Sequence, residues 1–429
     1  MKQVETLIVG AGVTGLAAAG QLGIQDYLVI EADTTIGGYC KTIERSGFVW
    51  DYSGHFFHFR NPSVDRWLRE RMRPEVVVST VRKKAFVAYG GRMLDYPFQK
   101  SIHQLPREEF LECLHDLYFA ERQTAQEPSR EPRRTLREML EARYGRGICE
   151  KFLFPYNEKV YACNLDELDP GAMGRFFPAP SLADIIRHFR DARDDSYNAT
   201  FSYPSSGAIA YVDALASAVR PDSLSMEEGL VSVDRTRRVA MTTRREIGFG
   251  RMISTLPLPL LAALSGLEHD PGAFSWSKVL VFNFGFDAKG PRDVHWVYFP
   301  SPDVSFYRVG FYDNILGTDR MSLYVEVAMS RTAVPERERL RSRVLSDLRA
   351  AGVVSGQRLV AEHSVMLDPA YVHISKRAEA ERERVRALLE EQSIYSAGRY
   401  GAWRYCSIED NIVEAWELVR RLRGGAGTA

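Results

Sequence analysis

The sequence predicts an α/β protein in which a Rossmann-like dinucleotide-binding domain is interrupted by a helical domain and by an antiparallel β-sheet domain. Three observations predict this fold class. Residues 1–38 follow the order strand, glycine-rich turn, helix, strand. Residues 105–195 carry a mainly helical pattern, and residues 277–328 are rich in strands with alternating aromatic side chains. At 429 residues the chain is long enough for two or three domains.

The first element is a short apolar strand, residues 7–9, that runs into the turn Gly10-Ala11-Gly12-Val13-Thr14-Gly15. A helix over 16–22 and a second apolar strand over 27–30 follow, and the second strand leads into Glu31. Glycines permit a tight turn and the close approach of a pyrophosphate, and the helix N-terminus offers N–H donors to its negative charge. Glu31 can accept hydrogen bonds from ribose hydroxyls. These residues predict a bound dinucleotide.

A second glycine pair, Gly37-Gly38, follows this acid by a few residues. Such a pair resembles the large class of flavoproteins that bind FAD through this unit, so we expect FAD rather than NAD alone. No second GxGxxG run marks a separate nicotinamide domain. The candidate cofactor-binding residues of the unit are Gly10, Gly12, Thr14, Gly15, Glu31 and Gly38.

The rest of the chain alternates between strand-rich and helix-rich stretches, with prolines and glycines at the changes. In order, we expect a hairpin at 41–52, strands at 76–87, helices that begin near 106 and 135, strands at 230–252 and 277–328, charged helices at 336–351 and 375–391, and a final strand and helix at 394–397 and 409–423.

These patterns divide the chain into three expected domains. They are an FAD-binding domain of residues 1–75, 203–265 and 392–429, a helical substrate- and nucleotide-binding domain of residues 96–200, and an antiparallel sheet domain of residues 76–95 and 266–391. Two insertions over the cofactor would enclose a substrate against its ring.

Composition excludes several other classes of protein. The formal net charge is zero, from 56 basic and 56 acidic side chains, so nothing favours nucleic acid or an anionic membrane as a partner. The five cysteines are scattered and form no CxxC, which argues against a disulfide framework or a zinc site and for a reducing cytoplasm. No apolar run approaches the ~18 residues of a membrane span. We therefore expect a soluble, cytoplasmic protein without a metal; its oligomeric state is not readable.

Five short motifs follow one another along the chain. They are Tyr96-Pro-Phe-Gln99, Tyr156-Asn-Glu-Lys-Val-Tyr161, Trp296-Val-Tyr-Phe-Pro300 followed by Phe306-Tyr307-Arg308, Asp368-Pro-Ala-Tyr371, and Gly398-Arg-Tyr-Gly-Ala-Trp-Arg-Tyr405. With these motifs the whole chain resembles the UDP-galactopyranose mutases, nearer to their eukaryotic branch. Tyr161 replaces that family's tryptophan, and Cys406-Ser-Ile-Glu-Asp-Asn411 replaces its Gly-Asn-Gln-Asp-His loop with a form seen among flavin amine and porphyrinogen oxidases.

The resemblance implies residues that hold the diphosphate of a nucleotide sugar. These are Arg175 and Arg308, whose planar forks suit bidentate contacts to phosphate, with Tyr371 and Tyr405 as hydroxyl donors. Alternatives are that Arg175 caps a helix, that Arg308 pairs with a carboxylate on the sheet, and that Tyr405 is a core aromatic residue. His55 is implied to lie against the flavin, and it completes the candidate catalytic set; a structural histidine is the alternative.

The resemblance also implies a cradle for base and ribose, formed by Phe98, Gln99, Tyr161 and Tyr298, with Asn157 able to reach either ligand. Aromatic residues at such positions are also common core material. On the cofactor side it adds Gly54, His55, Arg399, Asp410 and Asn411.

The implied reaction interconverts the pyranose and furanose forms of a nucleotide hexose. In the family, N5 of reduced FAD attacks the anomeric carbon and displaces the nucleotide. A UDP-sugar such as UDP-galactose is the first choice, with a GDP- or other NDP-sugar as the runner-up. NAD(P)H or another reductant would supply electrons. Two alternatives stay open: an FAD oxidase or desaturase of the amine oxidase or porphyrinogen oxidase type, and a flavin-binding partner protein without catalysis.

Overall fold

The computed structural model describes residues 1–126, 134–172, 180–190 and 199–424. Within these residues, seven strands form a sheet of order β10-β11-β12-β1-β2-β9, and β18 pairs with β12. The strands are β1 (Lys2–Val9), β2 (Tyr27–Ile30), β9 (Leu224–Ser225), β10 (Leu230–Asp234), β11 (Val239–Thr242), β12 (Glu246–Ser254) and β18 (Ile394–Ser396).

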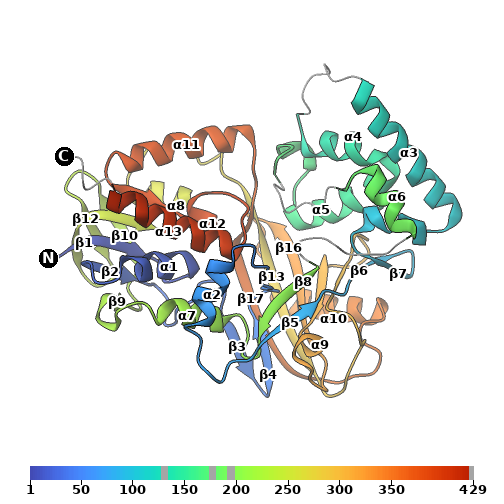
Figure 1. Ribbon diagram of the computed structural model, residues 1–429, viewed down its shortest axis with the longest axis horizontal. Helices are drawn as coiled ribbons and strands as arrows, with labels where there is room; N and C mark the ends of the chain where they lie inside the picture. Colours follow the sequence, from blue (N-terminus) through green and yellow to red (C-terminus); the bar gives the residue numbers. More distant parts are fainter. Residues whose placement is uncertain (127–133, 173–179, 191–198, 425–429) are drawn as a thin grey trace.

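The centre of this first sheet is parallel and buried. β1 pairs in parallel with both β2 and β12, and β12 pairs in parallel with β18. Every residue of β2 is buried, as expected for a strand covered on both faces. Figure 1 shows helices packed around the sheet near the two termini. They are α1 (Val13–Leu22), α7 (Ile209–Ala216), α8 (Leu258–Leu264), α11 (Lys376–Glu390), α12 (Gly398–Gly401) and α13 (Ile408–Gly424).

A second sheet has the order β17-β13-β16-β15-β14-β6-β7. Its pairs are antiparallel except that β14 and β6 are parallel. The strands are β6 (Ala85–Tyr89), β7 (Arg92–Asp95), β13 (Trp276–Phe286), β14 (Trp296–Tyr298), β15 (Arg308–Phe311), β16 (Ser322–Ser330) and β17 (Leu359–Val372). α9 (Tyr312–Leu316) and α10 (Arg337–Ala350) accompany this sheet (Figure 1).

The helical part lies beyond the second sheet, at the far side from the termini (Figure 1). It contains α3 (Arg107–Gln126), α4 (Leu136–Ile148), a π-helical turn (Cys149–Leu153) that continues into α5 (Phe154–Tyr161), and α6 (Leu182–Arg190). α2 (Pro62–Arg69) and two small ribbons, β3 (Thr42–Arg45) with β4 (Phe48–Asp51) and β5 (Val78–Arg82) with β8 (Thr200–Pro204), complete the described elements.

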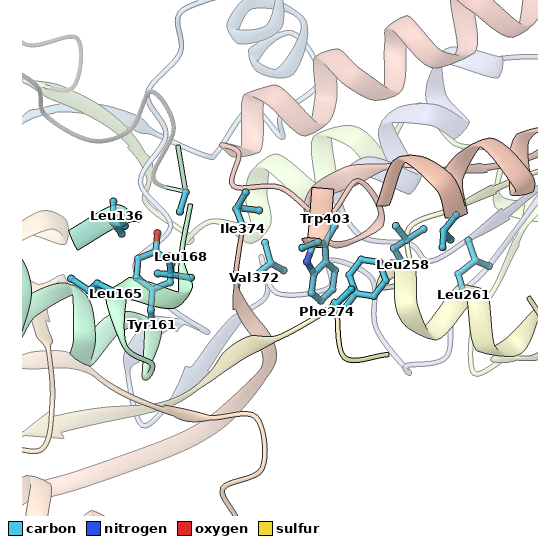
Figure 2. Close-up of a cluster of buried hydrophobic side chains, with 14 of the residues drawn as sticks. Leu136, Tyr161, Leu165, Leu168, Leu258, Leu261, Phe274, Val372, Ile374 and Trp403 are labelled. Carbon is cyan, nitrogen blue, oxygen red and sulfur yellow. The ribbon is translucent and has the colours of Figure 1, made fainter. Parts of the chain in front are cut away.

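One hydrophobic cluster connects the helical part to the first sheet. Figure 2 shows Tyr161 beside Leu165 and Leu168 at one end and Leu258 and Leu261 at the other. Val372, Ile374, Trp403 and Phe274 lie between them. Burial of large apolar side chains contributes roughly 1.5–3 kcal/mol each, so this cluster resists separation of the two parts.

The structure confirms the predicted fold class, with its interrupted dinucleotide-binding sheet, its helical insertion and its second, largely antiparallel sheet. Two elements differ from the expected domain boundaries. α11, expected with residues 266–391, packs against β18 of the first sheet, because Val385 and Leu389 share a core cluster with Ile394. β5, expected in the second sheet, instead pairs with β8.

Candidate active site

A cavity of about 630 Å³ is lined by residues from both sheets. The first sheet contributes the turn between β1 and α1 and the end of β2, and the second sheet contributes side chains of β13, β15, β16 and β17. The C-terminal segment supplies the turn at Gly398 and the start of α13. The lining includes many of the predicted site residues: Gly10, Gly12, Thr14, Glu31, Gly38, Gly54, His55, Arg308, Tyr371, Arg399, Tyr405 and Asn411.

The glycine turn leaves the N-terminus of α1 open to the cavity. Gly12 is the N-cap residue of α1. No side chain accepts a hydrogen bond at this cap, and the first turn of the helix contains no acidic residue. A Cβ on Gly12 would have Gly38 Cα, 3.9 Å away, as its nearest neighbour, so the space in front of the turn is clear. Free N–H donors beside clear space suit a pyrophosphate. Gly15 does not line the cavity; a Cβ there would lie 1.9 Å from Gly10 O, so it serves helix-to-strand packing.

Glu31 lies where β2 ends, and its carboxylate is held by two backbone donors. Ala11 N donates to Oε2 at 2.7 Å and Asp33 N donates to Oε1 at 2.9 Å. An ionised carboxylate has about four acceptor sites, so two remain for ribose hydroxyls. The glycine turn and Glu31 together fit the phosphate and ribose of a dinucleotide.

Arg308 on β15 lies in the cavity wall and pairs with Glu326 on β16. Nε donates to Glu326 Oε2 at 2.5 Å and Nη2 donates to Oε1 at 2.7 Å. Glu326 is 1% exposed and also accepts a short hydrogen bond from Ser53 Oγ. This pairing is the alternative that the sequence left open for Arg308. Within the described residues Nη1 makes no hydrogen bond, so one edge of the guanidinium remains available to a ligand in the cavity.

His55 stands next to this pair in the wall. Burial lowers the pKa of His55 to about 4; the Glu326 charge opposes this shift, and the Arg308 and Arg399 charges reinforce it. The imidazole is therefore neutral near pH 7 and can either donate or accept a hydrogen bond. Gly54 makes this placement possible, because a Cβ there would lie 2.5 Å from the hydroxyl of Tyr324.

Arg399 is surrounded by tyrosine rings rather than carboxylates. Its guanidinium carbon lies 4.6 Å from the ring centroid of Tyr405 and 5.5 Å from that of Tyr371, and its Nη1 donates to Cys406 O at 3.2 Å. Among the described residues no carboxylate forms an ion pair with it. Burial raises the pKa of Tyr371 to about 12, so its hydroxyl stays a donor. This end of the cavity attracts anions and electron-rich groups.

The start of α13 contributes one of the two residues expected there. Asn411 lines the cavity, accepts from Thr14 Oγ1 at 3.4 Å and donates from Nδ2 to Ser407 O at 2.8 Å. Asp410 is not in the lining; its Oδ2 accepts from the backbone N and Oγ of Ser407, both at 2.8 Å, at the start of the helix.

The four residues expected to form the base and ribose cradle, and Asn157, are not in the cavity lining. Phe98 stacks on Phe152 at 5.1 Å, and Asn157 Nδ2 donates to Leu153 O at 2.6 Å. Measured between ring centroids, Tyr161 lies 6.1 Å from Tyr371, and Tyr298 lies 4.6 Å from Tyr96. Gln99 is 1% exposed. Their contact with a nucleotide stays a prediction. Arg175 lies outside the described residues.

The sequence assigned no role to several residues of the wall: Ser53, Glu326, Tyr307, Asp368 and Tyr400. Glu326 carried a signal, since it is a lone charge in the buried apolar run Leu323-Tyr-Val-Glu-Val327. Buried charges are rare unless paired. Within the described residues, no cluster of side chains suited to a metal ion occurs, and no helix has the length and hydropathy to cross a membrane.

An interrupted dinucleotide-binding sheet, a glycine turn with its acid, and a cavity shared with an antiparallel sheet define an FAD-binding protein. The free N–H donors of the glycine turn and the two remaining acceptor sites of Glu31 fit the pyrophosphate and the ribose of FAD, which agrees with this class. The chain belongs to the family of flavin containing amine oxidoreductases, whose family model matches residues 13–422.

Solved structures share this fold over nearly the whole chain. A crystal structure of reduced UDP-galactopyranose mutase has a TM-score of 0.89 at 24% identity and covers 99% of this chain and 94% of that one. A candidate protoporphyrinogen oxidase from Exiguobacterium sp. 255-15 has a TM-score of 0.75 at 20% identity, with 98% of each chain covered. The chloroplastic protoporphyrinogen oxidase of Nicotiana tabacum is 26% identical over 97 residues, which span 22% of this chain and only 18% of that protein.

Proposed function

We propose that the chain is an FAD-dependent mutase that interconverts the pyranose and furanose forms of a nucleotide hexose, with a UDP-sugar such as UDP-galactose as first choice and a GDP- or other NDP-sugar as runner-up. The observation that carries the proposal is the convergence of Arg308, Arg399, Tyr371 and Tyr405 on the cavity that also contains the glycine turn. Cationic forks and hydroxyl donors suit a diphosphate. The likeness in fold to a reduced UDP-galactopyranose mutase supports it.

In this proposal the residues bind and orient, and the cofactor supplies the covalent chemistry. When bound and reduced, FAD supplies a nucleophilic nitrogen for displacement at the sugar carbon that carries the diphosphate. Arg308 contacts the diphosphate through Nη1 and stabilises the negative charge that develops on it, while Arg175 remains its expected partner. Tyr371 and Tyr405 donate to the same group and keep it in place for its return. NAD(P)H or another reductant would provide the electrons.

His55 and Glu326 set the charge around the reacting centre. A neutral His55 adds no positive charge beside the flavin and can offer one donor or one acceptor to it. Glu326 balances Arg308 in the absence of substrate, so the pair is neutral until a diphosphate approaches.

The second candidate is an oxidase or desaturase of the amine oxidase or porphyrinogen oxidase type. A specific observation favours it: Glu326 already satisfies two of the three guanidinium nitrogens of Arg308, as a purely structural ion pair would. The match to protoporphyrinogen oxidase and the segment from Cys406 to Asn411 agree with this alternative. It requires no diphosphate site.

The deciding experiment uses the purified holoprotein, reduced anaerobically with dithionite. It is incubated with UDP-, GDP-, CDP- and dTDP-hexoses, and chromatography and NMR are used to detect a furanose product of unchanged mass. The proposal expects product with reduced but not oxidised flavin. Arg308→Met should abolish turnover and retain FAD, whereas the matched variant Arg320→Met, of an exposed arginine outside the cavity, should leave turnover unchanged. No product with any sugar, together with oxygen consumption on an amine or alicyclic substrate, would establish the oxidase.

A further inference from the structure

Lys159 on α5 has an unusual environment for a lysine. Four backbone carbonyl oxygens lie within hydrogen-bond distance of its Nζ, those of Phe299 at 3.1 Å, Ser301 at 2.8 Å, Val304 at 2.9 Å and Phe306 at 2.6 Å. The ammonium group has three N–H donors, so one of them is shared between two oxygens. We call these four oxygens the carbonyl cage. Within the described residues Lys159 forms no ion pair. The carboxylates of Asp303 and Asp347, whose charges act on Lys159, have other partners: Asp303 accepts from Ser301 Oγ and Asp347 from Ser305 N.

The carbonyl cage belongs to the segment 299–306, which connects β14 to β15. Within the described residues no backbone N–H donates to these four carbonyls, so this segment depends on the ammonium group to satisfy them. The next residues along the chain are Tyr307 and Arg308, and both lie in the cavity wall. A shift of the segment would therefore move the wall.

The helix that carries Lys159 contacts the same wall with its aromatic side chains. Tyr156 lies 5.2 Å from Tyr298 and 6.2 Å from Tyr307, measured between ring centroids, and Tyr161 lies 6.1 Å from Tyr371. The ammonium group joins α5 to the segment between β14 and β15. Neither element lines the cavity, but both adjoin Tyr307, which does.

We propose that Lys159 is a positioning residue for the cavity wall: its ammonium group, bound in the carbonyl cage, fixes segment 299–306 and thereby Tyr307 and Arg308. The cage is selective for a compact cation, because its four oxygens lie 2.6–3.1 Å from a single nitrogen, whereas a planar guanidinium spreads its donors over three nitrogens. The expected effect of Lys159 on substrate binding rests on the proposed function, whereas its role in fixing segment 299–306 does not.

The test is chemical rescue in the holoprotein. Lys159→Ala leaves the cage vacant for an added cation, and Lys159→Met fills the same space with an apolar chain and leaves no room. Lys376→Ala, at an exposed lysine of α11, is the control. Each protein is measured for melting temperature, for the visible absorption spectrum of its flavin and for UDP affinity. The measurements are made with ammonium chloride and, at equal ionic strength, with tetramethylammonium chloride.

For Lys159→Ala we expect a lower melting temperature, a shifted flavin spectrum and UDP affinity weaker by about ten- to a hundredfold, as for lost hydrogen bonds to a charged group. Ammonium should reverse all three changes, tetramethylammonium should not, and Lys159→Met should respond to neither salt. A Lys159→Ala protein with the flavin spectrum and melting temperature of the wild type, or one that ammonium fails to restore, would overturn the proposal. If the wild type binds no nucleotide, the proposed function fails, and the spectrum and melting temperature still decide the role of Lys159.

Discussion

Replacement of Glu326 by alanine should leave a guanidinium without its partner in a nearly water-free wall. Arg308 is 17% exposed at its side chain and Glu326 is 1% exposed, and two charge-assisted hydrogen bonds join them. Removal of one partner of a buried pair costs about 3–5 kcal/mol. Glu326→Gln keeps one acceptor oxygen and the shape, so it should cost less, about 1–3 kcal/mol. The free energy of unfolding is measured by urea denaturation of the FAD-loaded protein.

A double-mutant cycle separates the interaction between the two side chains from the effects of truncation. Arg308→Met with Glu326→Leu replaces the pair by apolar groups of similar volume, and such replacements are often neutral. The double variant should therefore be more stable than either single variant, Arg308→Met or Glu326→Leu, while it loses any affinity for nucleotide sugars. Equal stability of Glu326→Ala and the wild type, or effects of the two substitutions that simply add, would refute the assignment of a strong buried pair.

Three further predictions concern the glycine turn, His55 and Asp51. Gly12→Ala should fold normally but bind FAD with at least about tenfold lower affinity, because its Cβ enters the clear space in front of the turn. Gly15→Ala should instead lower the melting temperature, because its Cβ would lie 1.9 Å from Gly10 O. His55 has a pKa of about 4 in the folded protein and about 6.5 in the unfolded chain. Between these pH values only the unfolded state gains the proton, so the free energy of unfolding falls as the pH is lowered, by on the order of 3 kcal/mol in full. His55→Gln should flatten this pH dependence, measured by urea unfolding from about pH 7 to 4. Asp51 accepts from Thr42 Oγ1 and Ala208 N at Oδ1 and from Tyr203 Oη at Oδ2. Asp51→Asn loses the charge and must reverse the hydrogen bond with Tyr203, so it should cost about 2 kcal/mol, read as a fall in melting temperature.

Much of the cofactor side could be predicted from the sequence, because it depends on local order. A strand, a glycine turn, a helix and an acid within 31 residues fix their own geometry, and Gly12 and Glu31 lie where that order requires. The sequence also allowed for the pairing of Arg308 with a carboxylate, but not for its identity. Glu326 is 18 residues away and meets Arg308 only because β15 and β16 pair with that register.

The substrate side was harder to predict because it depends on which face of each aromatic side chain points inward. Phe98 and Tyr161 occur in motifs typical of a nucleotide cradle, yet both are buried in the core cluster. Burial of a large ring is favourable wherever it occurs, so a motif of aromatic residues does not by itself separate a ligand contact from packing. Lys159 lies within one of these motifs, and only its four carbonyl partners reveal what it does.

The sheet that surrounds the glycine turn is assembled from distant parts of the chain, and this has a consequence for synthesis on the ribosome. β1 is made first, but its neighbour β12 ends at Ser254 and β18 begins only at Ile394. Gly398, Arg399 and Asn411, which close the cavity, emerge later still. We therefore expect a nascent chain that stalls before residue 394 to bind FAD poorly. The exposed edge of β12 in such a chain is a ready template for unwanted strand pairing, so capture of the flavin is among the last events of maturation.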